Sequence, residues 1–148
     1  MKYFIATERD IAFISKTYNE NIASLHGNHR DPDVWKKLLS DENTAYYIVR
    51  AEDPVAWFRI DLEDGGFWLG MLQVKPECQR NGIGKYILSV AEDMAKAKGF
   101  QKIGVHTTED NLAARALYLS AGYAVTEIGP CTTADGADRV GYTFEKEL

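Results

Sequence analysis

Two glycines, Gly82 and Gly84, stand between the basic side chains of Arg80 and Lys85 in the segment QRNGIGK. Glycine adopts positive φ angles and lets backbone N–H groups come close to a ligand. A helix that begins here adds unpaired N–H groups and about half a positive charge at its N-terminus. The segment therefore predicts an anion-binding turn.

Two common phosphate-binding motifs do not fit this turn. A dinucleotide-binding G-x-G-x-x-G that starts at Gly82 needs a glycine at position 87, which is Ile87. A P-loop that ends in Gly84-Lys85 needs glycine at position 79 and serine or threonine at position 86, where Gln79 and Tyr86 stand. The anion must be identified by other means.

Hydrophobic spacing predicts a single α/β domain over residues 1–148. The predicted strands are rich in aromatic and β-branched side chains, and turn residues join the second, third and fourth of them into an antiparallel meander. In chain order the predicted strands are Lys2–Ala6, Ala45–Ala51, Val55–Glu63, Phe67–Val74, Lys102–Thr107, Tyr123–Ile128 and Arg139–Leu148.

Four helices are predicted between these strands. The first is a long, uninterrupted amphipathic helix over Ile11–Leu25, and the second begins at Asp31-Pro32, a good N-cap followed by a first-turn proline. The third runs over Gly84–Lys98 and stops at a glycine. The fourth, over 111–121, is capped by an aspartate or asparagine at its start.

Composition excludes several classes of protein. The formal net charge of −5 argues against nucleic-acid binding, which depends on phosphate neutralisation. Two cysteines are too few for a disulfide scaffold or a zinc cluster, so no metal site is predicted. The apolar start of the chain is interrupted by Glu8, Arg9 and Asp10, and no stretch approaches the roughly 20 apolar residues that cross a bilayer. We therefore expect a cytoplasmic protein with neither a nucleic-acid nor a membrane partner.

The pattern V-x-P-x-x-Q-R-x-G-x-G over 74–84 resembles the acyl-CoA-binding signature of the GNAT superfamily of N-acetyltransferases, with Gln79, Gly82 and Gly84 in its Q/R-x-x-G-x-G/A core. A second family motif, N-x-x-A-x-x-L-Y-x-x-x-G-Y, is similar to the segment from Asn111 to Tyr123. The predicted order of elements also matches the family. The resemblance implies a mixed, mostly antiparallel twisted sheet of about seven strands flanked by four helices.

The resemblance further implies acetyl-CoA as cosubstrate. In the family the pantetheine arm pairs with the strand before the turn, where one N–H group polarises the thioester carbonyl, and the turn itself holds the pyrophosphate. Mapped onto this chain, the cofactor-binding residues are Leu72, Gln73, Val74, Gln79, Arg80, Asn81, Gly82, Ile83, Gly84, Lys85, Asn111 and Tyr118. Lys75, Arg80 and Lys85 against Glu77 give this segment a local charge of +2, which suits phosphates.

Transfer to an amine requires loss of the ammonium proton and benefits from an acid at the departing thiolate. Tyr118 matches the family's tyrosine and is predicted to be that acid, although a core tyrosine would show the same spacing. His106 is a candidate base, because an imidazole takes up a proton near neutral pH. It lies five residues before Asn111, where the branch that acetylates ribosomal-protein N-termini has glutamate. A structural role for His106 stays open, as do Asp61 or Glu63 acting through water.

We therefore read the sequence as an acetyl-CoA-dependent N-acetyltransferase that acts on a primary amine of a small molecule or peptide. Two alternatives stay open: an acyl-CoA sensor without turnover, and a protein N-terminal or lysine acetyltransferase. Family members often form homodimers, which is an option for this chain. The loops 26–31 and 129–139 are candidates for acceptor contacts, but they carry no motif that names the acceptor.

Overall fold

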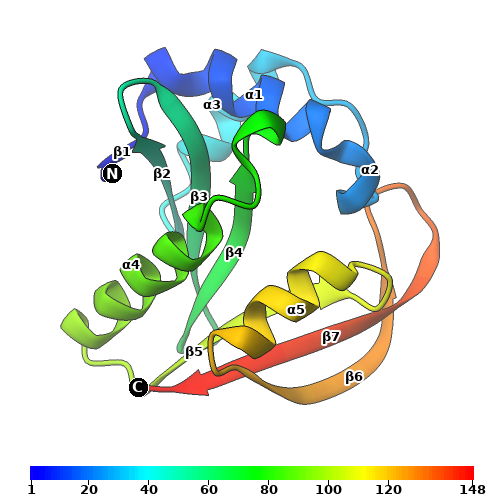
Figure 1. Cartoon of the computed structure of the whole chain (residues 1–148). Helices are drawn as coiled ribbons and strands as arrows, with labels where there is room; N and C mark the ends of the chain where they lie inside the picture. Colours follow the sequence, from blue (N-terminus) through cyan, green and yellow to red (C-terminus); the bar gives the residue numbers. More distant parts are fainter.

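Seven strands form one twisted sheet in the order β1-β2-β3-β4-β5-β7-β6 (Figure 1). The computed structural model describes residues 1–148. All neighbouring strands are antiparallel except β4 and β5, which run parallel. The expected mixed, mostly antiparallel sheet is therefore confirmed. The strands are β1 (Lys2–Ile5), β2 (Thr44–Arg50), β3 (Pro54–Glu63), β4 (Gly66–Val74), β5 (Lys102–Thr108), β6 (Ala124–Thr132) and β7 (Asp138–Glu147).

Five α-helices and two short 3-10 turns, η1 and η2, connect the strands. They are η1 (Glu8–Asp10), α1 (Ile11–Glu20), α2 (Ile22–Leu25), α3 (Pro32–Leu39), η2 (Pro76–Cys78), α4 (Ile83–Ala97) and α5 (Leu112–Ser120). None of the helices combines the length and apolar character that crossing a membrane requires.

The uninterrupted first helix expected over Ile11–Leu25 is corrected by the structure, because Asn21 separates α1 from α2. The Asn21 backbone leaves helical geometry at φ −97° and ψ 7°. Its side chain donates to Gln73 Oε1 (3.1 Å) and to the Val74 carbonyl (3.0 Å), both on β4. These tertiary bonds compete with the helical path, so α2 is a separate turn beside the end of β4.

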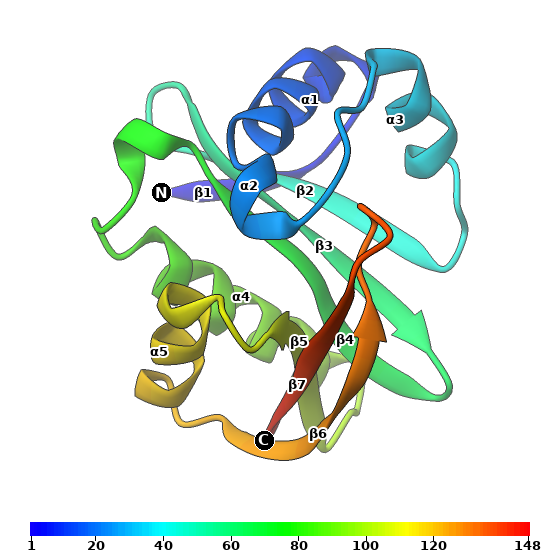
Figure 2. The ribbon, with the colours of Figure 1, turned by 90° about the vertical axis from the view of Figure 1, so that its right-hand side faces the viewer.

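The two faces of the sheet carry separate cores. Helices α4 and α5 cover one face, and α1 and α3 cover the β1–β3 part of the other face (Figure 2). Side chains of β3 alternate between the two cores, with Ala56, Phe58 and Ile60 in the larger core and Trp57 in the smaller one. In the smaller core Trp35 packs edge-on against Trp57, with ring centroids 5.5 Å apart.

The parallel pair of β4 and β5 is short. Only Trp68↔Gly104 and Leu69↔Val105 are paired, and the strands part beyond them. At that point β4 carries a bulge, because Ile60 of β3 pairs with Leu69 while its neighbour Arg59 pairs with Met71, which leaves Gly70 without a partner.

An ion pair accompanies this bulge. Arg59 Nε and Nη2 donate to the two carboxylate oxygens of Asp61, at 2.6 and 2.7 Å. A Cβ atom added at Gly70 would collide with that carboxylate. Glycine is therefore required at position 70 so that the ion pair can lie against the bulged strand.

We expect Gly70→Ala to destabilise the fold by about 1–3 kcal/mol, because the new methyl group displaces the Arg59–Asp61 pair. Denaturant unfolding measures the change. Gly129→Ala in β6 is the matched control, since nothing lies within 4 Å of its added Cβ, and it should stay within about 0.5 kcal/mol of the parent. Equal stability of the two variants would contradict the crowding described at Gly70.

Candidate functional site

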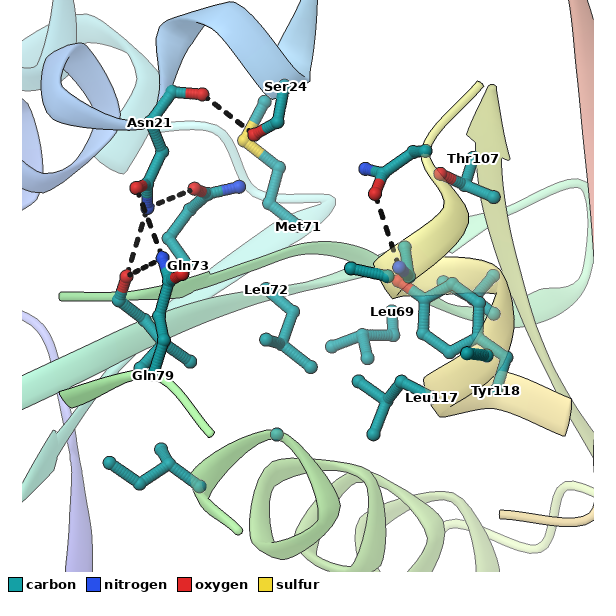
Figure 3. A pocket seen from close by; sticks show the side chains of 18 of the residues that line it. Asn21, Ser24, Leu69, Met71, Leu72, Gln73, Gln79, Thr107, Leu117 and Tyr118 are labelled. Atoms are coloured by element: carbon teal, nitrogen blue, oxygen red, sulfur yellow. Dashed lines mark hydrogen bonds between the residues drawn. The ribbon is translucent and has the colours of Figure 1, made fainter. Parts of the chain in front are cut away.

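The separation of β4 and β5 opens a cleft of about 1100 Å³ (Figure 3). Its walls come from β4, from the turn before α4, from the end of β5, from α5 and from α2. The backbone N–H and C=O groups of every second residue of β4 are hydrogen-bonded to β3. The N–H and C=O groups of the alternate residues along 70–74 therefore face the opening. Leu72, Gln73 and Val74, predicted to bind a pantetheine arm, line this wall.

One end of the cleft is formed by the glycine turn. Arg80 and Gly82 both have positive φ angles, 63° and 81°, and α4 begins directly after them. The first intrahelical hydrogen bond of α4 runs from the Tyr86 N–H to the Gly82 carbonyl (3.1 Å). The N–H groups of residues 83–85 therefore have no acceptor within the helix. The side chains of Arg80 and Lys85 line the cleft and form no ion pair. The structure thus has a cationic, amide-rich pocket end.

The two glycines of the turn have different physical roles. Nothing lies within 4 Å of a Cβ added at Gly82, so glycine is favoured at this position by the positive φ angle and not by lack of space. A Cβ added at Gly84 would lie 3.0 Å from Leu117 Cδ2, which is tight contact between α4 and α5. Gly84 therefore lets the helices approach each other, a role that the expectation of close ligand approach did not include.

A side-chain network closes the cleft near the end of β4, and Figure 3 shows it around Asn21 and Gln79. Gln79 Nε2 donates to Asn21 Oδ1 (3.3 Å) and to the Val74 carbonyl (3.2 Å), which Asn21 also binds. Asn21 lines the cleft but was missed by the sequence reasoning. The available signal was an asparagine on the apolar side of a helix, three residues after Tyr18 and four before Leu25.

Tyr118 of α5 belongs to the wall of the cleft that lies across from β4. Its ring packs against Phe144 and Tyr123, with centroids 5.4 and 6.2 Å away. Burial raises the pKa of Tyr118 to about 12, and its hydroxyl has no hydrogen-bond partner within the chain. The Tyr118 hydroxyl is thus a protonated, unpaired donor beside the cleft. Asn111 caps α5 by accepting from the Ala114 N–H (3.2 Å), and it too lines the cleft.

His106 lies where the cleft meets a second cavity of about 510 Å³ that extends towards the β6–β7 hairpin. Ser24, Leu25, Thr107 and Asn111 line both cavities with it. A group bound at this junction would face the cleft on one side and the second cavity on the other.

Some sequence candidates are not brought to the cleft. Asn81 does not line it, and its side chain donates to the Cys78 carbonyl (3.3 Å). The Asp61 carboxylate is engaged by Arg59 on both oxygens and lines neither cavity. Glu63 is exposed at the end of β3 and lines neither cavity. Among the candidate bases, His106 therefore has the best position.

The loop after α2 reaches across to the tip of the β6–β7 hairpin. The Asp135 N–H donates to the His26 carbonyl (3.0 Å), and Asn28 Nδ2 donates to the Ala134 carbonyl (2.8 Å). His26 Nε2 lies 2.8 Å from Asp110 Oδ2. The loop 26–31 is therefore joined to the tip of the hairpin. The loop expected over 129–139 is shorter in the structure, because residues 129–132 extend β6 and residues 138–139 begin β7, which leaves 133–137 as the turn.

Comparison with known proteins identifies the family of the chain and solved structures with the same fold. The model of the "Acetyltransferase (GNAT) family" matches residues 13–123. A curated relative, "Probable N-acetyltransferase 14" of Xenopus tropicalis, is 36% identical over 70 residues, which cover 47% of this chain. The match spans only 30% of that relative's length.

Solved structures match along the whole chain. A putative phosphinothricin N-acetyltransferase superposes with a TM-score of 0.85 at 21% identity, covering 99% of this chain and 98% of that one. The putative acetyltransferase YncA from Salmonella typhimurium, solved with acetyl-CoA, superposes with a TM-score of 0.80 at 20% identity, covering 100% and 94%. At these identities the likeness establishes a shared fold.

Proposed function

We propose that this chain, which belongs to the acetyltransferase (GNAT) family, transfers an acetyl group from acetyl-CoA to a primary amine of a small molecule or peptide by direct attack. The observation that carries the proposal is one cleft that combines the free edge of β4, the amide-rich start of α4 and the Tyr118 hydroxyl. Each of these groups would serve one part of a thioester that is linked to a phosphorylated nucleotide. The acetyl-CoA held by YncA, a protein of the same fold, supports the choice of donor.

The residues around the cleft fit the parts of coenzyme A. The amides of 83–85, the start of α4 and the side chains of Arg80 and Lys85 would hold the pyrophosphate. The alternate N–H and C=O groups of Leu72–Val74 would pair with the amides of the pantetheine arm, as in strand addition. One of these N–H groups would polarise the thioester carbonyl. Asn111 and Tyr118 would contact the arm from α5.

Proton transfers are divided between two side chains. As the amine nitrogen bonds to the acyl carbon and the C–S bond breaks, His106 takes the proton of the amine. The pKa of Tyr118, about 12, is above the value near 8.5 of an ordinary thiol. Tyr118 therefore donates a hydrogen bond to the sulfur as negative charge develops there, keeps its proton, and lets coenzyme A leave as the thiolate, in place of the proton transfer expected from the sequence.

Acetyl-CoA incubated with a panel of primary amines is expected to release free thiol only when protein and a suitable amine are present. Thiol-reactive dye and the mass of the acetylated amine measure the reaction. Binding of acetyl-CoA without amine-dependent thiol release from any amine would overturn the enzyme and support an acyl-CoA sensor. Acetyl groups that appear only on macromolecules would support the protein acetyltransferase.

Gly82→Val should weaken acetyl-CoA binding about tenfold or more, measured by calorimetry. A β-branched residue at φ 81° costs more than about 1.4 kcal/mol, so the turn rearranges and its amides turn away from the pyrophosphate. Gly99→Val is the control, because Gly99 has φ 84° and equal open space but lies at the other end of α4. If both variants keep the parent affinity, the pyrophosphate does not bind at this turn.

Tyr118→Phe should lower kcat about 100-fold and leave the Kd for acetyl-CoA within about twofold. Because burial raises the pKa of Tyr118 to about 12, the parent hydroxyl stays protonated, and kcat should not fall between pH 8 and about 10 through loss of this proton. Stopped thiol-release assays across pH check both statements. Tyr86→Phe, whose hydroxyl contacts the Met1 carbonyl, is the control and should keep full turnover. Unchanged turnover in Tyr118→Phe would reduce Tyr118 to a packing residue.

A further inference from the structure

We propose that Thr143 and Trp68 are positioning residues, which hold the His106 imidazole with its proton on Nδ1 and the Nε2 lone pair towards the cleft. The inference rests on the proposed function, in which His106 accepts the amine proton. Two contacts of the ring distinguish His106 from an ordinary exposed histidine near the end of a strand.

The first support of the ring comes from β7. His106 Nδ1 lies 3.0 Å from Thr143 Oγ1, and the two residues face each other directly in the β5–β7 register. No other hydrogen bond reaches the ring, so Nε2 is free of protein partners. Since the two ring nitrogens are on different sides of the imidazole, Thr143 at Nδ1 leaves Nε2 for a ligand at the junction of the two cavities.

The second support comes from β4. The Trp68 indole is stacked on the imidazole, with ring centroids 4.5 Å apart and planes only 11° from parallel. Trp68 pairs with Gly104, and a Cβ atom at Gly104 would collide with the indole. The glycine two residues before His106 therefore makes room for the stack. With one face covered and Nδ1 held, the ring has little freedom to tilt or turn.

Charges on the same face favour a proton on Nδ1. Glu127 of β6 is the cross-strand partner of Thr143, lines the second cavity and forms no ion pair. Glu145 of β7 lies two residues further along that face, where it binds Lys102 (2.7 Å) and Thr126 (2.7 Å). On β3, next to Trp68, Arg59 and Asp61 neutralise each other. The uncompensated negative charge thus lies on the Thr143 side of the imidazole.

The proton path follows from this placement. Nδ1–H donates to Thr143 Oγ1 throughout, and the Nε2 lone pair takes the proton released by the amine nitrogen as its bond to the acyl carbon forms. The resulting imidazolium keeps its hydrogen bond to Thr143 Oγ1 and its stack on the Trp68 indole. It returns the Nε2 proton to water through the second cavity, so the side chain ends as it began.

The tautomer can be measured without substrate. Long-range ¹H–¹⁵N spectra of the histidine-labelled protein distinguish a protonated ring nitrogen from one with a lone pair. His106→Gln identifies the His106 signals among the three histidines of the chain. At a pH where the ring is neutral, we expect the proton on Nδ1. Thr143→Val, which removes the hydroxyl and keeps the shape, should move a measurable part of the population to Nε2–H, whereas Thr143→Ser should not.

The same variants have a kinetic signature. Thr143→Val should lower kcat about tenfold and shift the acidic limb of the pH–rate profile to lower pH, because the imidazolium loses the acceptor of its Nδ1 proton. Thr143→Ser should stay within about twofold, and Thr44→Val, a threonine on β2 outside both cavities, should equal the parent. His106→Gln should remove the acidic limb.

A proton on Nε2 in the parent protein, or a tautomer that Thr143→Val leaves unchanged, would overturn the inference and leave the proposed acetyl transfer intact. Absence of transfer to every amine would instead refute the proposed function. The spectra would still decide whether Thr143 sets the tautomer, so the two failures are distinguishable.

Discussion

The separation of β4 from β5 after two residue pairs is the constraint on which the rest of the site depends. Had the parallel pairing continued, β5 would occupy the edge of β4, and no main-chain groups would face a ligand. The bulge at Gly70 marks the point of separation, and the Arg59–Asp61 pair lies against it. A pair on β3, outside both cavities, therefore helps to determine the shape of a cleft that it does not line.

Charge is distributed along the two cavities in a way that the net value of −5 conceals. The charged side chains at the α4 end of the cleft are Arg80 and Lys85, whereas the second cavity is lined by Glu127. In the proposed reaction, phosphates and a protonated amine would thus bind at separate ends, with His106 between them. The overall acidity of the chain predicts little about this arrangement, because short-range charges act at the site and distant ones are screened.

The fold was predictable where local signals agree with tertiary packing. Alternation in β3 and the glycine turn before α4 are examples, since the residue types that form them also bury the core or open the turn. The break at Asn21 was not predictable, because the cause is a pair of hydrogen bonds to residues more than fifty positions away. The packing role of Gly84 was not predictable either, because its neighbour Leu117 is apparent only after α5 is placed. The junction position of His106 likewise needs the sheet register, although its place in the sequence pointed to it.

Tyr118 and His106 lie in opposite environments, and the proposed chemistry needs that difference. A hydrogen-bond donor to a developing thiolate must stay protonated throughout the reaction, which the buried phenol with its raised pKa does. A base for the amine must discharge its proton after each turnover, which requires access to water, and the open second cavity provides it. Exchanging the two environments would disable both groups: a buried imidazole could not release its proton, and an exposed phenol would be hydrogen-bonded to water. Access to water on one wall therefore gives the proton its direction, from the amine to solvent through His106, while the buried Tyr118 donates a hydrogen bond to the sulfur and keeps its proton.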